Sequence, residues 1–425
     1  MKTAYVNARL LDPASGLDAT GGLIVENAVI SEVGANVVAP QSVEHIHDCK
    51  GLCLAPGLID LRVKTGEPGA AHRETLESAG QAAIAGGVTT MAVMPDTSPV
   101  IDDVALVEFI ARRGEAMSAC KVLPTGALTR GLRGEAISEL GLMREAGAAF
   151  FTNADHALSD LSVLRRVLVY AAGLDAKVFL QPQDAALTGS GVMNAGALAA
   201  RMGLAGMPLE AEWIAAQQVI ILAERTGASV VLDQVTTART VDAIEEARGR
   251  GIDIAYTIAA HHLYFNELDI GDYLTYCKVS PPFRSEDDRR ALIEAVQSKR
   301  VNAVVSAHDP QPPETKRLPF EEASFGAAGL ETALSAMISL VHMEDMPLLD
   351  ALAPLTLGPA ELLSLPQGRL TPGAPADLVL FDPDLPWVCD RSELRSRSTN
   401  SPFDGRRLQG RVLATIVNGK AVFTR

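Results

Sequence analysis

The stretch LCLAPGLIDLRVKTGEP, from Leu52 to Pro68, decides the fold. It is apolar up to a Pro-Gly turn and then continues as a short branched run, Leu58–Val63. A short apolar run bounded by turn residues is typical of a buried strand in a parallel sheet. Because side chains alternate along a strand, Arg62 and Lys64 are expected on one face at its carboxyl end.

Strand and helix signals alternate along residues 56–365. The expected strands are Leu58–Val63, Val88–Met94, Lys121–Leu128, Ala149–Asn153, Lys177–Pro182, Ser229–Val235, Asp253–Ile258 and Asn302–Ala307. The expected helices between them include His72–Ala85, Ser138–Ala146, Leu158–Ala172, Leu209–Arg225 and Ala238–Arg248. Eight strands that alternate with helices predict an α/β fold, a (β/α)8 TIM barrel.

Both ends of the chain are rich in short strand signals broken by turn residues. We expect residues 1–55 and 366–425 to pair into one small composite β-sandwich domain beside a barrel of residues 56–365. Active sites of such barrels form at the carboxyl ends of the strands, so the candidate site residues are read from those ends.

Composition excludes several classes of function. The chain has 425 residues, with 37 Lys and Arg against 52 Asp and Glu, a net charge of −15. An acidic chain without a basic run argues against nucleic acid or an anionic membrane as partner. No apolar run reaches the length of a membrane span. Five scattered cysteines indicate reduced thiols and a cytoplasmic location.

The chain resembles the dihydroorotases of the amidohydrolase superfamily, of the long bacterial type. The Pro-Gly turn with Ile59-Asp60 follows the family pattern Pro-Gly-apolar-Ile-Asp-x-His-x-His. Near the other end the matching segments are Ala376–Asp382, Ser398–Phe403 and Thr415–Gly419. The resemblance therefore covers essentially the whole chain. It implies the composite β domain, a role in pyrimidine biosynthesis and self-association into a homo-oligomer.

The resemblance also shows which positions should bind metal. At five of them this chain has other residue types: Arg62, Lys64, Asn153, Gln181 and Gln234. A zinc site needs at least three ligands from His, Asp, Glu and Cys, and protonated Arg and Lys have no lone pair to give. We therefore expect no metal cofactor.

The last pair of family ligands is reversed in order and reads His308-Asp309. Adjacent residues on a strand point to opposite faces, so one of the two should point away from the site.

Substrate-binding positions of the family differ as well. Asp96 stands where the family has an asparagine, and Gly66 where it has an arginine. Ser280 replaces a second asparagine and Pro312 a histidine. An anionic substrate needs such donors, so no catalytic residue is expected at this barrel mouth.

The two cations need a partner if they are buried, because an unpaired buried charge costs several kcal/mol. We predict that Arg62 or Lys64 forms an ion pair with a strand-end carboxylate, where the two cations can offset nearby Asp60, Asp96 or Asp309. The alternative is that both are surface charges at the barrel rim.

Two functions remain open. By resemblance, the chain is a pseudoenzyme that assembles with aspartate carbamoyltransferase as a structural subunit. The alternative is a working dihydroorotase, or a hydantoinase-like or allantoinase-like cyclic-amide hydrolase. It would need a metal, zinc by resemblance, held by an atypical set such as Asp60, Asp155, His308 and Asp309, or else a metal-free mechanism.

Overall fold

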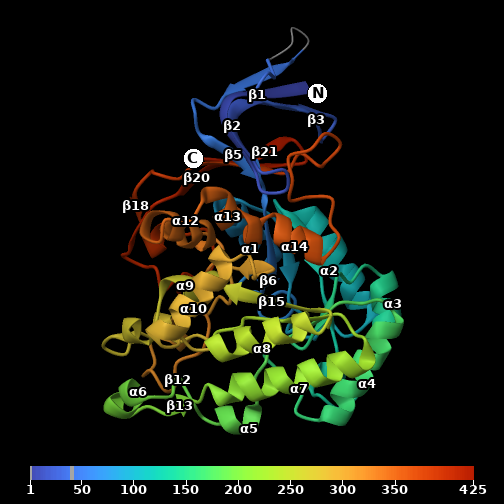
Figure 1. Ribbon diagram of the computed structural model, residues 1–425, viewed down its shortest axis with the longest axis vertical. Coiled ribbons are helices and arrows are strands. Elements are labelled where there is room, and N and C mark those ends of the chain that lie inside the picture. Colours follow the sequence, from blue (N-terminus) through green and yellow to red (C-terminus); the bar gives the residue numbers. More distant parts are fainter. Residues whose placement is uncertain (1, 39–42) are drawn as a thin grey trace.

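Eight parallel strand positions close into a barrel in the computed structural model, which describes residues 2–38 and 43–425 (Figure 1). In order around the ring they are β6 (Leu58–Val63), β7 (Val88–Val93), β8 (Lys121–Pro124) continued by β9 (Gly126–Ala127), β10 (Phe151–Thr152), β11 (Val178–Leu180), β14 (Val230–Leu232), β15 (Ile254–Ala259) and β16 (Ala303–Val305). A parallel bridge between Val63 and His308 closes the ring. The predicted TIM barrel is confirmed, and the expected strand Lys121–Leu128 is interrupted at Thr125.

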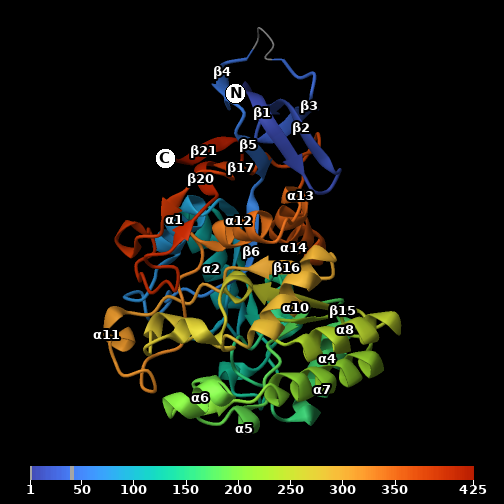
Figure 2. The ribbon, with the colours of Figure 1, turned by 60° about the vertical axis from the view of Figure 1, so that its left-hand side comes forward.

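Helices surround the barrel and cover its strands (Figures 1 and 2). The longer ones are α1 (Leu76–Ala85), α2 (Val104–Met117), α4 (Leu161–Gly173), α7 (Glu210–Thr226), α8 (Ala238–Gly249), α10 (Glu286–Gln297) and α12 (Ala333–Met343). The shorter ones are α3 (Leu140–Glu145), α5 (Ala185–Thr188), α6 (Ala197–Met202), α9 (Ala260–Tyr264), α11 (Pro313–Lys316), α13 (Leu348–Leu352) and α14 (Leu357–Leu362). Within the described ranges, no helix is both long enough and apolar enough to cross a membrane.

Two helices begin later than the sequence predicted, because a capping residue lies inside the expected range. The side chain of Thr75 accepts a hydrogen bond from the Ser78 amide and starts α1. The side chain of Asp160 does the same for the first amides of α4. Such caps satisfy amides that have no partner within the helix.

The barrel interior is a packed apolar core. Phe150 and Phe179 stack with ring centroids 3.9 Å apart, among Ile59, Val231 and Val305. Side chains of α14 join this cluster and close the end where the strands begin. The opposite end, where the strands finish, is the barrel mouth.

The two chain ends build one β domain above the barrel (Figures 1 and 2). Its sheet contains β1 (Lys2–Asp12), β2 (Leu17–Glu26), β3 (Val29–Gly34), β4 (His45–Asp48), β5 (Cys53–Pro56), β17 (Leu378–Asp382), β20 (Arg411–Val417) and β21 (Lys420–Thr424). The composite domain is confirmed, because β5 pairs directly with β17. The expected sandwich is one continuous sheet, whose register shifts mark bulges that bend and twist it.

Two further strand pairs are small. β12 (Met193–Asn194) pairs with β13 (Gly206–Met207), and β18 (Trp387–Val388) pairs with β19 (Arg407–Leu408).

Candidate functional site

Arg62 lies at the end of β6, with only 3% of the residue exposed. Its guanidinium forms ion pairs with Asp155 and Asp233. It also donates to the Gln181 side-chain oxygen at 3.4 Å. With its amide oxygen turned toward the guanidinium, Gln234 accepts from Nε at 2.7 Å and from Nη2 at 3.1 Å. The guanidinium is therefore enclosed by acceptors that follow β10, β11 and β14, which are neighbours of one another in the ring.

Lys64 follows β6 and points into the same mouth. Its Nζ forms an ion pair with Asp155 and lies 3.0 Å from Asp96 and 3.3 Å from Asp309. The predicted pairing of a strand-end cation with Asp96 or Asp309 is thus confirmed for Lys64. Arg62 also pairs with strand-end carboxylates, as predicted, but these are Asp155 and Asp233 and not the nearby Asp60, Asp96 or Asp309.

These contacts keep the side chains of Arg62, Lys64 and Asp155 ionised at neutral pH. Burial alone would lower the pKa of Arg62, but the charges of Asp233 and Asp155 raise it above its usual value. Burial and nearby carboxylates oppose each other in the same way at Lys64, whose pKa is also raised. Burial would raise the pKa of Asp155, but Lys64 and Arg62 lower it to about 2.

Asp60 does not face the cations. Its carboxylate accepts from the backbone amides of Arg62 at 3.1 Å and Ser306 at 3.2 Å. Burial raises the pKa of Asp60 to about 6, although these hydrogen bonds oppose the shift. Asp60 therefore links β6 to β16, and its carboxylate oxygens are not available as metal ligands.

His308 and Asp309 point to different partners, as strand alternation predicted. The buried His308 ring lies 3.4 Å from Glu74 through Nε2 and accepts from the Gly329 amide through Nδ1. Asp309 instead contacts Lys64 and, at 3.0 Å, Arg73.

The atypical set Asp60, Asp155, His308 and Asp309 consequently does not converge. No group of three or more His, Cys, Asp or Glu suited to a shared metal ion occurs in the part of the chain that the structure describes. Zinc needs such a group, so the residues present at the mouth do not fit it.

The remaining family-ligand positions are used internally. Asn153 is buried and its amide exchanges hydrogen bonds with Thr129, including one of 2.8 Å to Oγ1. Gln181 donates from its amide nitrogen to Gln183 at 3.1 Å. Both amides therefore have partners within the barrel end.

The positions that correspond by resemblance to substrate-binding residues of the family offer few hydrogen-bond donors. At Gly66 a Cβ atom would overlap the carbonyl oxygen of Ala70, so the local backbone excludes an arginine there. Ser280 lines the mouth, and Pro312 lies just before α11. A proline has no amide proton to donate to an anion.

The mouth has almost no free volume. The cavity between Arg62, Lys64, His261 and Asp309 is about 10 Å³. Such a space holds about one water molecule, whereas small-molecule pockets enclose about 300–1,000 Å³.

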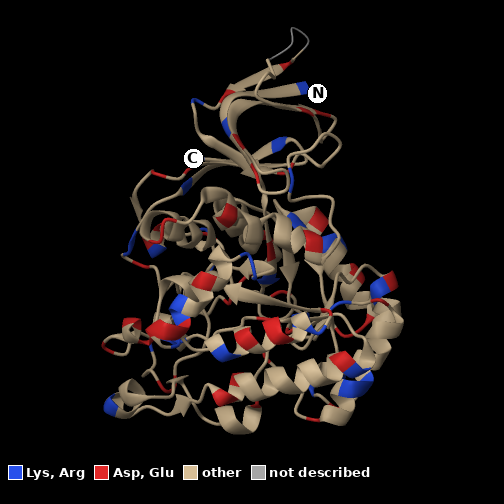
Figure 3. Cartoon of the chain, viewed as in Figure 1, with Lys and Arg blue, Asp and Glu red and all other residues tan. Residues whose placement is uncertain are grey.

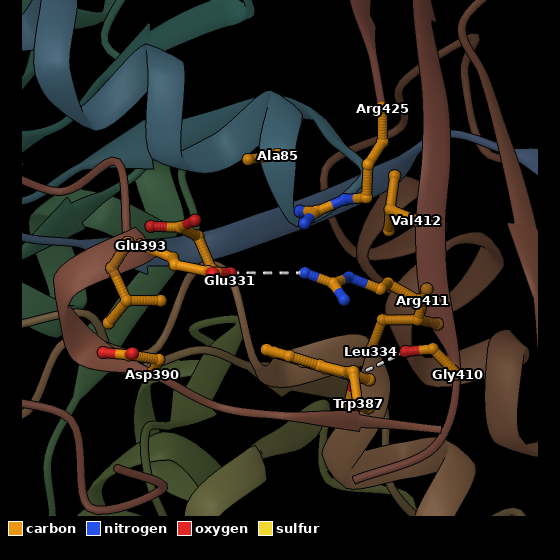
Figure 4. Close-up of a pocket in the computed structure, with 12 residues that line it drawn as sticks. Ala85, Glu331, Leu334, Trp387, Asp390, Glu393, Gly410, Arg411, Val412 and Arg425 are labelled. Atoms are coloured by element: carbon orange, nitrogen blue, oxygen red, sulfur yellow. Dashed lines mark hydrogen bonds and ion pairs between the residues drawn. The ribbon is translucent and has the colours of Figure 1, made fainter. Parts of the chain in front are cut away.

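A second cavity at the seam between barrel and β domain is equally small (Figure 4). Arg411 and Trp387 face Glu331 and Glu393 there, across about 20 Å³. It has room for one or two water molecules and offers no substrate pocket.

Sequence reasoning missed several partners in the mouth. Asp233 was not singled out, although it directly precedes Gln234 at the end of β14. Arg73 and Glu74 lie before α1, inside a range that was expected to be helical. The position of Asp233 next to a site residue was the one available signal.

Comparison with known proteins agrees with this architecture. The family model "Dihydro-orotase-like" matches residues 51–239, and the model "Amidohydrolase family" matches residues 208–422. A dihydroorotase from Syntrophotalea carbinolica is 38% identical over 423 residues, which cover 100% of this chain and 99% of that protein. The chain belongs to the dihydroorotase family. Another dihydroorotase, from Pelobacter propionicus, is 36% identical over 425 residues and is covered in full.

Solved structures with the same fold include more distant amidohydrolases. The L-hydantoinase (dihydropyrimidinase) of Arthrobacter aurescens superposes with a TM-score of 0.90 at 23% identity, covering 99% of this chain and 95% of that one. The dihydropyrimidinase of Brevibacillus agri gives a TM-score of 0.86 at 20% identity, with coverage of 100% and 95%. The dihydroorotase-family chain thus has a TIM barrel with a β-rich domain built from both ends.

Proposed function

We propose that this dihydroorotase-family chain acts in pyrimidine biosynthesis as a non-catalytic structural subunit. Its partner in this proposal is aspartate carbamoyltransferase, which the family resemblance suggests. The fold of the family is retained over the full chain, while the barrel mouth has become a packed ion-pair cluster.

One observation carries the proposal: the mouth is filled by its own charges. Arg62 and Lys64 pair with Asp96, Asp155, Asp233 and Asp309 and leave a cavity of about 10 Å³. A cyclic amide would have to displace these buried pairs, and breaking such a pair costs about 3–5 kcal/mol.

The chemistry of the donors supports the same conclusion. In a metal-dependent hydrolase, the ion activates water and polarises the amide. Here the strand ends present a guanidinium, an ammonium and amides, none of which supplies the negatively charged or imidazole ligands that zinc prefers. We derive no reaction step through a metal in this chain.

An apolar patch near the mouth supports a role in assembly. Leu268, Tyr273, Leu274 and Leu318 are between 42% and 63% exposed. The Thr275 hydroxyl donates to the Lys316 carbonyl, which holds the two segments of the patch side by side. Exposed apolar patches of this kind mark protein interfaces. We propose this patch as the contact with aspartate carbamoyltransferase.

Dihydroorotate turnover by the purified chain is the first test. We expect no hydrolysis above the uncatalysed rate, with or without added zinc. Co-purification from the native host should recover aspartate carbamoyltransferase, and Leu268→Asp together with Leu274→Asp should abolish recovery. Turnover at an enzymatic rate would refute the proposal that the subunit is non-catalytic.

A second candidate function is an active cyclic-amide hydrolase. The specific observation in its favour is that relatives 36–38% identical over their full length bear the name dihydroorotase. On this reading, elemental analysis after dialysis should find stoichiometric zinc. The proposed subunit should contain well under one zinc per chain.

A further inference from the structure

A cavity of about 520 Å³ lies at the seam between the barrel and the β domain, where the barrel strands begin. Two of its lining residues, Lys177 and Asn302, stand directly before β11 and β16. The turn between β1 and β2 adds Pro13 from the β domain. Other lining residues belong to α13 and α14, which lie between the β domain and the barrel (Figures 1 and 2). The cavity thus lies at the opposite end of the barrel from the mouth and shares no lining residue with the mouth cavity.

The size and place of this cavity suit a small organic molecule. Small-molecule pockets enclose about 300–1,000 Å³ and form preferentially at interfaces between domains. Active sites of TIM barrels form at the other end, where the strands finish. A ligand of the seam cavity is therefore expected to be bound and not converted.

The barrel side of the cavity is held in place by contacts within the fold. The side-chain oxygen of Asn302 accepts from the Tyr256 amide at 3.1 Å and from the Arg248 guanidinium. A Cβ atom on Gly358 would overlap the Asn302 carbonyl oxygen, so α14 packs directly on the chain that leads into β16. The wall is therefore set by the fold itself.

Apolar side chains from several segments contribute to the lining. They belong to the end of α10 and the chain after it, to α13, to the 3-10 helix η4 (Ala353–Leu355) and to α14: Val296, Val301, Leu349, Pro354, Leu357 and Leu362. Burial of apolar surface against such a wall favours binding. The ligand should therefore have an apolar body.

The charged residues of the lining favour a positive charge on the ligand. Lys299 Nζ lies 2.9 Å from Asp350, and Lys177 Nζ lies 3.8 Å from Asp253. Both lysines therefore already have a carboxylate partner. Glu361 also lines the cavity and is exposed, but it forms no ion pair within the described ranges. One negative charge of the lining is thus uncompensated.

We propose that the seam cavity binds a small organic cation, with its apolar body against α14 and its ammonium group beside Glu361. Acidic and basic residues are interspersed along outer helices such as α8 (Figure 3). No broad field of one sign is therefore available there to select the ligand, and the local charge of Glu361 decides. The site is independent of the mouth, so this inference holds whether or not the chain catalyses a reaction.

Calorimetric titration of the intact chain with two matched probes tests the proposal. Tryptamine joins an apolar indole to a primary ammonium, and indole-3-propionate carries a carboxylate on the same ring and linker. One equivalent of tryptamine should bind with a dissociation constant below about 1 mM. The anion should bind about tenfold more weakly, because it meets the Glu361 carboxylate. Equal affinity for the two probes, or no binding of tryptamine, would overturn the proposal.

Glu361→Gln tests the charge of the site. It should weaken tryptamine binding about fivefold, as expected for loss of an exposed ion pair. Glu115→Gln is the matched control, because Glu115 is also exposed near the end of a helix and forms no ion pair among the described residues. Both variants remove the same charge from the chain, so equal affinities in the two would refute the role of Glu361.

Leu357→Trp tests the location. The larger side chain should occupy the cavity and abolish tryptamine binding, while the circular dichroism spectrum and the thermal midpoint show whether the chain is folded. Tryptamine that still binds to a folded Leu357→Trp chain must bind elsewhere, and the seam cavity would then not be its site.

Discussion

Removal of the Arg62 guanidinium should destabilise the fold strongly, because it leaves Asp233 without its cation. Both residues are only 2–3% exposed, and their ion pair lies inside the barrel end. Breaking a buried pair by deleting one partner costs about 3–5 kcal/mol. For Arg62→Met we expect the thermal midpoint to fall by roughly 5 °C, since a long chain shifts about 1–2 °C per kcal/mol.

The cause of that loss can be isolated by a double-mutant cycle. Asp233→Asn keeps an oxygen that accepts from the Thr257 hydroxyl, and it removes the carboxylate charge that Arg62→Met leaves unpaired. Combined with Arg62→Met, it should recover most of the lost stability. Arg112→Met, which removes an exposed arginine on α2, should change the free energy of unfolding by less than about 0.5 kcal/mol. If the double variant unfolds as readily as Arg62→Met, the buried ion pair is not what holds the mouth together.

Three further perturbations test the mouth and its surroundings. Arg62→His with Lys64→His should not create a zinc site, because the family-ligand positions Asn153, Gln181 and Gln234 remain amides; elemental analysis after dialysis should find well under one zinc per chain. Gly66→Arg should lower the melting temperature, because its Cβ overlaps the Ala70 carbonyl oxygen. Burial lowers the pKa of His262 to about 4 from 6.5. As pH falls, the native state therefore binds a proton at His262 only at a lower pH than the unfolded state does. The stability that the neutral His262 contributes is present above pH 6.5 and is lost as pH falls toward 4. Between these pH values the native chain should lose about 3 kcal/mol more stability than His262→Gln, as measured by urea unfolding.

The fold was predictable because its signals are local and repeated. Each barrel strand is a short apolar run followed by a turn, as at Leu58–Val63, and this pattern needs no tertiary information. Helix starts were less predictable. Thr75 and Asp160 cap α1 and α4 from within stretches whose whole pattern is helical, so each helix begins later than its pattern. The β domain is one continuous sheet because β5 pairs with both β1 and β17, and the second pairing joins residues so distant in the sequence that no local pattern shows it.

The sequence predicted which residues lie at the site, but not which cation pairs with which carboxylate. Strand ends located Lys64, Asp96 and Asp309 at the mouth, and all three meet there. The sequence could not show that Arg62 reaches across to Asp233, because the two residues belong to strands on different sides of the ring. Which carboxylate meets which cation depends on side-chain directions that only the closed barrel sets.

At the mouth, two fixed cations lie among acidic strand ends. Asp155, Asp233 and Asp309 lie close together, and their mutual repulsion would destabilise this end if nothing positive lay between them. Here Arg62 and Lys64 supply two covalently attached positive charges to the same carboxylates. The electrostatic requirement of the fold is thus met by side chains of this chain, since each of the two cations contacts at least two of these carboxylates. On the proposed function, the same contacts separate stability from catalysis, because they occupy the strand ends where a hydrolase needs an open metal position and an activated water.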